Sequence, residues 1–332
     1  MKQLSKFRRA TVAFALTAAA FTPVMAQKVS METATATSVV GLMPQSMAPI
    51  WSEAGMGIEL AMGQTLTKSL LKLGQGSLDT AVVPPPAFAN LKVGKGPYAK
   101  LGAEKGAELA DNTRALWGFT ASNYHPIVWA DSDVKDWSGL KGKRIYTGPP
   151  AGAANAQIKA LIKQGSGYVE GTDYEGVKAP WNVAAQGFKD GQYDVLILPG
   201  ALGSQVITEM GLARNIRILG LPADASPPAA LGMVKSVIPK GTYQGQVNSD
   251  ESLTSWQTVM MVMAKKDLDE VTAYKLTKAY VESRKRLASG NALLKELQND
   301  DPLGGVIAPL HPGAARYFSE AGINIPKAIM PR

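Results

Sequence analysis

The sequence predicts an α/β protein made of two similar layered halves. Its 332 residues suffice for two domains of ordinary size. Short β-branched or apolar runs alternate with longer helical segments, a pattern typical of parallel strands joined by crossover helices. The layout also repeats, because in each half a first strand leads into a small-residue loop and a helix. A later apolar strand follows a Gly-x-x-Asp turn in each half, at 76–79 and at 191–194.

The composition narrows the class of protein. Hydrophobic residues make up 45% and charged residues 19% of the chain, which is typical of a globular protein. The absence of cysteine excludes thiol catalysis, disulfide bonds and cysteine-ligated metal sites. With two histidines in the chain, we expect no histidine-rich metal site and no cofactor.

The first 26 residues have the three parts of a signal peptide. Four basic residues between positions 2 and 9 precede the apolar run Ala10–Phe21, which is too short to span a bilayer. Small residues at positions 24 and 26 form a cleavage site. We therefore expect a signal peptide over 1–26, cleavage after Ala26 and a periplasmic mature protein that begins at Gln27; the alternative is an N-terminal membrane anchor.

The charge gives little support for a nucleic-acid partner. The first 26 residues hold four of the basic residues and none of the acidic ones, so the formal charge falls from +8 to +4 without them. Two short basic runs remain, at 141–144 and 284–286. Each is interpreted as a solvated loop or helix face, and we expect no nucleic-acid binding.

The first half contains the following predicted elements. Alternating or apolar runs predict strands at 29–35, 58–61 and 78–83. Longer amphipathic segments predict helices at 44–53 and 66–73. Three prolines at 84–86 end the third strand, and the Gly- and Lys-rich residues 92–112 are interpreted as a surface excursion.

The second half repeats the pattern. Strands are predicted at 115–119, 127–130, 143–146, 194–198, 216–219 and 259–263. Helices are predicted at 154–164, 181–188, from about 201 to 210, and at 269–287. Residues 222–256 are rich in Pro, Gly and Ser and are interpreted as mainly loop.

The helix starts that follow strands are the candidate binding sites. The first amides of a helix are unpaired and lie at the positive end of its dipole, so they bind anions. Two small-residue loops of this kind occur at 63–65 and 148–154, and neither matches a nucleotide-binding signature. The predicted ligand-binding residues are Thr37, Ser38, Gly63, Gln64, Thr65, Ala151, Gly152, Ala153, Ala154 and Asn155, with Trp181, Pro199, Gly200 and Trp256 as candidates for the wall and floor.

No catalytic constellation is evident. His125 and His311 have no acidic or hydroxyl partner at a catalytic spacing, and each is interpreted as a structural hydrogen-bond donor. The chain contains no G-x-S-x-G elbow and no H-E-x-x-H motif. The sequence therefore predicts a binding protein and not an enzyme.

Four stretches then indicate a family. IVWADSDVK at 127–135 with LKGKRI at 140–145, and FKDGQYD at 188–194, are similar to segments of many periplasmic solute-binding proteins. IPKGTYQGQ at 238–246 and PLHPGAARYFSEAG at 309–322 are more specific. Together they resemble the TAXI family, the TRAP-transporter-associated extracytoplasmic receptors, over residues 28–323. The loop at 35–41 lacks the Gly-rich, Tyr-containing stretch of the family, and the loops at 62–65 and 148–154 carry fewer hydroxyls than those of the family.

The resemblance implies a type II periplasmic binding protein, with two α/β lobes joined by two hinge strands around a central ligand cleft. The crossings are expected near 122–126 and 255–259, which divides the chain into lobe one, 27–124 plus 260–332, and lobe two, 125–259. The implied ligand is a small carboxylate or amino acid, glutamate-like or a dicarboxylate. The implied partner of this monomer is a TRAP-type permease driven by an ion gradient.

Two alternatives remain. One is a receptor of another tripartite or ABC-type uptake system on the same fold. The other is a secreted α/β enzyme, against which the missing catalytic motifs argue.

Overall fold

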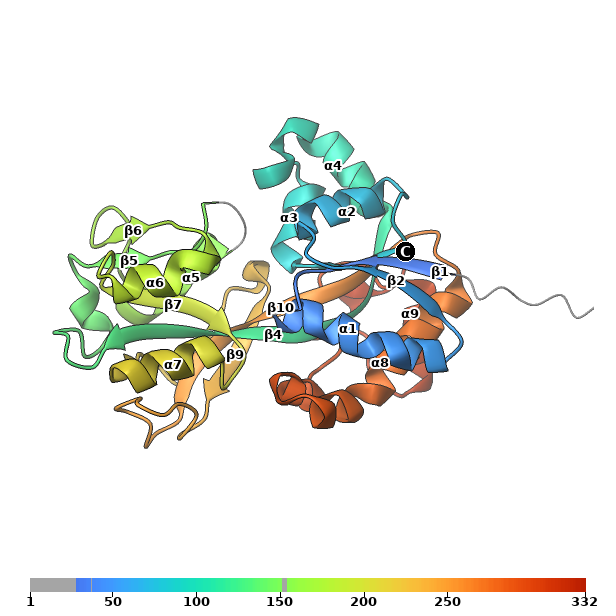
Figure 1. The fold of residues 1–332 in the computed structure, drawn as a ribbon. Coiled ribbons are helices and arrows are strands. Elements are labelled where there is room, and N and C mark those ends of the chain that lie inside the picture. The colour runs from blue at the N-terminus through green and yellow to red at the C-terminus, as the bar shows by residue number, and fades with distance from the viewer. Residues whose placement is uncertain (1–27, 37, 151–153) are drawn as a thin grey trace, which may run out of the picture.

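The computed structural model describes residues 28–36, 38–150 and 154–332. The predictions for residues 1–26, for Thr37 and for residues 151–153 lie outside these ranges. The described chain forms two α/β lobes on one mixed sheet, and two long strands cross between the lobes (Figure 1). The predicted two-lobe α/β fold is confirmed.

The described strands are β1 (Lys28–Glu32), β2 (Gly57–Ala61), β3 (Thr80–Val83), β4 (Thr113–Trp129), β5 (Arg144–Tyr146), β6 (Glu175–Val177), β7 (Val195–Gly200), β8 (Ile216–Ile218), β9 (Met233–Ile238) and β10 (Leu253–Lys265). The α-helices are α1 (Val39–Glu53), α2 (Leu66–Gly74), α3 (Pro85–Lys92), α4 (Gly102–Asp111), α5 (Ala154–Ser166), α6 (Trp181–Lys189), α7 (Gln205–Ala213), α8 (Glu270–Gly290) and α9 (Pro312–Glu320). Short 3₁₀ helices are η1 (Gly96–Leu101), η2 (Trp137–Leu140), η3 (Ala229–Leu231), η4 (Ala292–Asn299) and η5 (Lys327–Ile329).

The sheet has a parallel group in each lobe. Its order is β2-β1-β3-β10-β4-β7-β5-β6, with β8 also paired to β4 and β9 to β10. The pairs β1–β2 and β1–β3 are parallel, as are β5–β6 and β5–β7, whereas β4 and β10 run antiparallel to their neighbours. The carboxyl ends of each parallel group therefore lie at one edge, where strand-to-helix loops of the kind that bind ligands are placed.

The repeated Gly-x-x-Asp turn has the same structural role in both lobes. Asp79 accepts the backbone N–H of Ser30 on β1 at 2.9 Å, and Asp194 accepts that of Arg144 on β5 at 2.9 Å. Burial opposes ionisation of both aspartates, but hydrogen bonds from Ser30 and from Arg144 leave the pKa of each below its usual range. The two halves therefore share this side-chain hydrogen bond as well as their order of elements.

The hydrophobic core divides along the crossing strands. One cluster holds Trp51, Trp117 and Tyr280, and it ends on β4 at Ala121 and on β10 at Met261. Two further clusters cover the opposite faces of the other half of the sheet, one with α5 and one with α6 and α7. Between these cores, the two crossing strands are the main continuous connection, as Figure 1 shows.

Several predicted elements need correction. Strands predicted at 115–119 and 127–130 are one strand, β4, because the polar residues between them are paired with β7 and do not form a loop. Residues predicted as a surface excursion include η1 and α4, and residues 222–256 contain β9. The prolines at 84–86 end β3 as predicted, and Pro85 also lies in the first turn of α3.

Helix α1 begins at Val39, five residues before its predicted start, with Pro44 inside it. Proline has no N–H, so it cannot bond the Val40 carbonyl one turn earlier. The buried hydroxyl of Thr33 donates to that carbonyl at 2.7 Å. This side-chain bond replaces the missing backbone bond and allows the helix to start earlier than the proline suggests.

Candidate ligand-binding cleft

The strand-to-helix loops of lobe one start from neighbouring parallel strands. In Figure 1, β1 ends and α1 begins beside the crossing strands β4 and β10, so this loop lies at the boundary between the lobes. Ser38 is the N-cap residue of α1, yet its hydroxyl donates to the carbonyl of Thr35 at 3.0 Å and makes no cap bond. No described side chain therefore occupies the first amides of α1.

The second loop has the same property. Gly63 has a φ of 73°, a conformation that favours glycine, and it turns the chain from β2 toward α2. The Gln64 side chain donates to the carbonyl of Met62 at 3.0 Å, and exposed Thr65 is the N-cap of α2 without a side-chain cap bond. These three predicted residues lie at one helix start, as expected.

Side-chain caps are distributed unevenly over the described helices. They are absent from the helix starts that follow parallel strands, α1, α2, α3, α6 and α7. By contrast, Asp269 caps α8 and His311 caps α9, accepting a first-turn amide in each case. Helix α4 is also uncapped, and it continues directly from η1. The loops at the carboxyl ends of the parallel strands thus leave helix amides available.

The corresponding loop of lobe two lies between β5 and α5. Gly148 has a φ of 95°, and the Asn155 side chain donates to the carbonyl of Thr147 at 3.0 Å. Ala154 and Asn155 are half-buried in the first turn of the helix. The predicted positions Ala151, Gly152 and Ala153 lie outside the described residues, so the structure places the two predicted residues that follow them.

The predicted wall residues have different surroundings. Trp181 opens α6 with 40% of its surface exposed, and its ring meets Tyr146 edge-on at 5.7 Å. Pro199 and Gly200 end β7, half-buried and paired with β4. Trp256 is fully buried, and its indole donates to the carbonyl of Ala225 at 3.4 Å, so the structure places this ring in the core.

A buried polar group on the crossing strand was not predicted as part of a site. Asn123 and His125 lie two residues apart on β4, and strand periodicity gives them the same face. Asn123 donates to the Glu296 carboxylate at 2.9 Å, and His125 Nε2 lies 2.8 Å from the Tyr243 hydroxyl. The alternation of polar residues inside the expected crossing at 122–126 is the sequence signal that indicates this group.

Burial controls the charge of this polar group. It lowers the pKa of His125 to about 4, so the ring is neutral at pH 7. It raises the pKa of Glu296 against the hydrogen bond from Asn123, and Asp300 beside it adds to the increase. His311 acts as a hydrogen-bond acceptor for Gly313, which corrects the expected donor role.

Two cavities among the described residues lie away from the predicted binding residues. One of about 340 Å³ lies in lobe two beside Trp137 and Arg217, and one of about 160 Å³ lies in lobe one beside Arg114. Within the described ranges, no three His, Asp or Glu side chains gather as a metal site would require. None of the helices in those ranges has the length and apolar character needed to cross a membrane.

Comparisons with known proteins found similar solved structures and a matching family. A periplasmic sulfonate-binding protein from Methylobacillus flagellatus KT is 13% identical, with a TM-score of 0.52 over 92% of this chain and 82% of that one. The periplasmic aliphatic sulphonate-binding protein of Escherichia coli is 13% identical, with a TM-score of 0.48 over 88% of this chain and 83% of that one. A TRAP periplasmic solute-binding protein of Ochrobactrum anthropi is 13% identical, with a TM-score of 0.46 over 90% of this chain and 88% of that one. The NMT1-like family matches residues 54–322. This match covers most of the sequence, and the chain therefore belongs to the NMT1-like family.

Proposed function

We propose that the protein is a periplasmic solute-binding protein that captures a small organic anion between its lobes and delivers it to a membrane transporter. The observation that carries this proposal is the row of uncapped helix starts at the carboxyl ends of the parallel strands. Such amides stabilise an anion without a buried cation. A binding role without catalysis also fits the buried, neutral state of His125.

Hinge closure is the second part of the proposal. Lobe one is taken as 27–124 plus 260–332 and lobe two as 125–259, so that β4 and β10 form the hinge. The change of hydrophobic cluster along both strands supports this division. Bending two strands between separate cores disturbs few packed contacts, and closure around a ligand removes it from water.

The ligand class has two candidates. The resemblance to TAXI receptors favours a carboxylate or amino acid and a TRAP-type permease. The M. flagellatus protein is described as part of a sulfonate ABC transporter, which favours a sulfonate and an ATP-driven partner. Helix amides can donate to the oxygens of either group. We prefer the carboxylate because the C-terminal motif at 309–322 resembles that of TAXI receptors, and both classes are tested.

A thermal-shift panel tests the proposal. Purified mature protein is heated with L-glutamate, succinate, ethanesulfonate or uncharged glucose. A ligand at a hundredfold excess over Kd adds about 2.7 kcal/mol to the stability of the folded state. We expect the melting temperature to rise with one class of acid and not with glucose. No rise with any acid, or a rise with glucose alone, would overturn the anion proposal.

A substitution at a helix start makes the test specific. Thr65→Asp places a strong capping carboxylate where the α2 amides are uncapped, so it should compete with the bound anion and repel it. We expect the ligand-induced shift to disappear while the protein remains folded. Thr172→Asp adds the same charge at an exposed turn of lobe two and should leave the shift unchanged.

Processing is tested separately. N-terminal sequencing of the protein from the periplasm should begin at Gln27 or within a residue or two of it. A mature chain that retains the basic residues at positions 2–9 would contradict both the cleavage site and the periplasmic location.

A further inference from the structure

A buried glutamine connects a candidate binding helix to the crossing strands. Gln157 lies in the first turn of α5 and is 5% exposed. Its side-chain oxygen lies 2.7 Å from the hydroxyl of Tyr124 on β4, and its side-chain nitrogen lies 2.7 Å from the carbonyl of Leu231 in η3. The Leu231 carbonyl can only accept, so the amide orientation is fixed and the Tyr124 hydroxyl is the donor.

The same bonds extend to the second crossing strand. The Ser255 hydroxyl on β10 donates to the backbone carbonyl of Tyr124 at 2.6 Å. Further along β10, Val259 N–H donates to the carbonyl of Gly232, the residue after η3, at 2.9 Å. Gln157 is therefore linked through Tyr124 and through η3 to both strands that cross between the lobes.

The 3₁₀ helix η3 also reaches the other lobe. At Gly232 a Cβ atom would lie 2.8 Å from Cγ of Pro85, closer than real contacts allow, so the Gly232 backbone packs directly against the Pro85 ring. Pro85 begins α3, one of the uncapped helix starts of lobe one. The path from α5 through Gln157, Leu231 and Gly232 to Pro85 thus joins helix starts of both lobes.

An apolar side chain of similar volume would fill the position of Gln157 equally well. The helix face around Gln157 packs with Tyr124, Ile158 and Leu161 in one hydrophobic cluster. A polar side chain buried in such surroundings is tolerated because its hydrogen bonds are made, and those bonds select one arrangement over others of similar packing. The glutamine thus sets geometry more than it adds hydrophobic stability.

We propose that Gln157 is a positioning residue, which sets the lobe-to-lobe arrangement by holding the start of α5 to β4 and to η3. The inference rests on the proposed function, because the arrangement matters as the one in which helix starts of both lobes face a shared ligand. When a ligand draws the start of α5 toward lobe one, these bonds carry the movement to the crossing strands.

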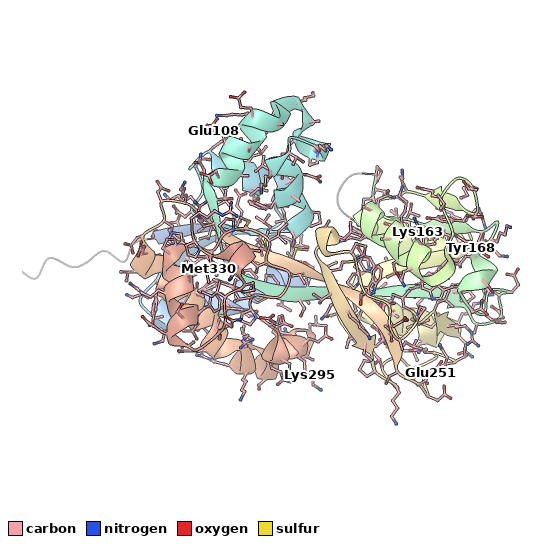
Figure 2. The ribbon with its side chains drawn as sticks, turned by 180° about the vertical axis from the view of Figure 1, so that it is seen from behind. Glu108, Lys163, Tyr168, Glu251, Lys295 and Met330 are labelled. Atoms are coloured by element: carbon pink, nitrogen blue, oxygen red, sulfur yellow. The ribbon has the colours of Figure 1, made fainter. Side chains whose placement is uncertain are left out.

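Distance measurements on spin-labelled protein test the inference. The chain has no cysteine, so labels can be placed at Glu108→Cys on α4 and Lys163→Cys on α5, which Figure 2 shows on different lobes. A second pair, Lys163→Cys with Glu251→Cys, lies within lobe two. In Gln157→Leu we expect the first distance distribution to shift or broaden while the second stays as in the parent protein.

A titratable variant gives a readout that a purely structural role would not move. In Gln157→Glu the ionised carboxylate cannot donate to the Leu231 carbonyl, whereas the protonated form can. The titratable side chain that contacts position 157 is Tyr124, with Tyr146 near it, and burial raises the pKa of Tyr124, so it stays protonated. We expect the parent distribution at about pH 5 and the altered one at about pH 8, against parent protein at each pH.

Hydrogen exchange and a matched variant complete the experiment. Loss of the two bonds in Gln157→Leu should speed amide exchange in the second turn of α5, at 158–161, where the helical N–H groups are hydrogen-bonded, by about tenfold. Gln186→Leu removes an exposed side-chain bond to Asp190 on α6 and should change neither distance.

The inference is overturned if Gln157→Leu leaves the interlobe distribution unchanged, if Gln157→Glu shows no dependence on pH beyond that of the parent, or if Gln186→Leu has the same effect. It is also overturned if the Lys163–Glu251 distance changes equally, because Gln157 would then merely hold α5 onto its own lobe. These measurements need no ligand, so a negative result in them does not contradict the proposed function. A negative result in the thermal-shift panel likewise does not affect the interpretation of the distance measurements.

Discussion

Two buried tyrosines offer a matched test of the polar group on the crossing strand. The Tyr243 hydroxyl lies 2.8 Å from His125 Nε2 and accepts the N–H of Gly203 at 3.2 Å. The Tyr280 hydroxyl is also buried, but no described group bonds to it, and its ring stacks on Trp117 at 4.8 Å. Removal of each hydroxyl therefore has opposite consequences.

The expected magnitudes follow from the partners left behind. Tyr243→Phe leaves the fully buried ring nitrogen of His125 without a partner, and an unsatisfied buried group costs about 1–3 kcal/mol. The N–H of exposed Gly203 can bond to water instead. We expect a loss of about 1–3 kcal/mol in the free energy of unfolding. Tyr280→Phe removes a hydroxyl that was buried without a partner and keeps the stacked ring, so it should be neutral or stabilising by about 1 kcal/mol.

Guanidinium unfolding followed by tryptophan fluorescence measures both changes. It is done at pH 7, where His125 is neutral, and the two variants should keep the parent slope with denaturant. Equal changes in the two variants, or a loss below about 0.5 kcal/mol in Tyr243→Phe, would refute the reasoning from unsatisfied partners. The test bears on the candidate cleft because Gly203 belongs to the loop between β7 and α7.

Three further predictions use single substitutions. Burial raises the pKa of Glu296, so the folded state gains stability as the pH falls from 7 toward 4.5. Glu296→Gln should lose that part of the gain, which denaturation at both pH values measures. Gly232→Ala should destabilise more than Gly241→Ala in the same assay, because both have positive φ but the new Cβ meets Pro85 only at position 232. Trp181→Ala should weaken binding of whichever acid shifts the melting temperature, measured by calorimetry, without loss of folding, since this side chain is 40% exposed; unchanged affinity would remove the ring from the cleft wall.

Most strands and helices of the parallel groups were predictable because their signals are local, whereas β6 and α3 were not predicted. Apolar runs at 80–83 and 195–198 and the Gly-x-x-Asp turns before them identify buried strands in both halves. The turn aspartates then hold the first strand of each lobe by the same backbone hydrogen bond. Local residue types were sufficient here because each segment depends mainly on its neighbour in the same lobe.

The crossing strand was harder to predict because its stability comes from partners far away in the sequence. Residues 120–126 contain Ser, Asn and Pro, which are typical of turns, yet Thr120 pairs with β10, residues 123–126 pair with β7, and Asn123 bonds to Glu296. Helix α1 was misplaced for a similar reason, since the hydroxyl that replaces the proline N–H comes from Thr33, seven residues before the carbonyl it bonds. Neither partner can be inferred from the local pattern.

The candidate site was predictable by position but not by bonding. Ser38, Thr65 and Ser204 are residue types that normally cap helices, and sequence reasoning would assign their hydroxyls to the first-turn amides. The structure shows that none of them makes such a bond. A cap of this kind is worth about 1 kcal/mol, so each of these helix starts forgoes a stabilising bond that its own sequence could make.

This distribution of caps argues for a ligand more strongly than residue identity does. A protein selected for stability alone would use those hydroxyls, as it uses Asp269 at α8 and His311 at α9, away from the strand-to-helix loops. The uncapped amides are instead found after parallel strands in both lobes, where an anion with several oxygens can accept from more than one helix at once. Binding then supplies the bonds that the helix starts lack, and it does so only when the lobes are close enough for one ligand to reach both. Under the proposed function, the same feature accounts for affinity and for closure, and the spacing that we propose Gln157 holds belongs to the binding site.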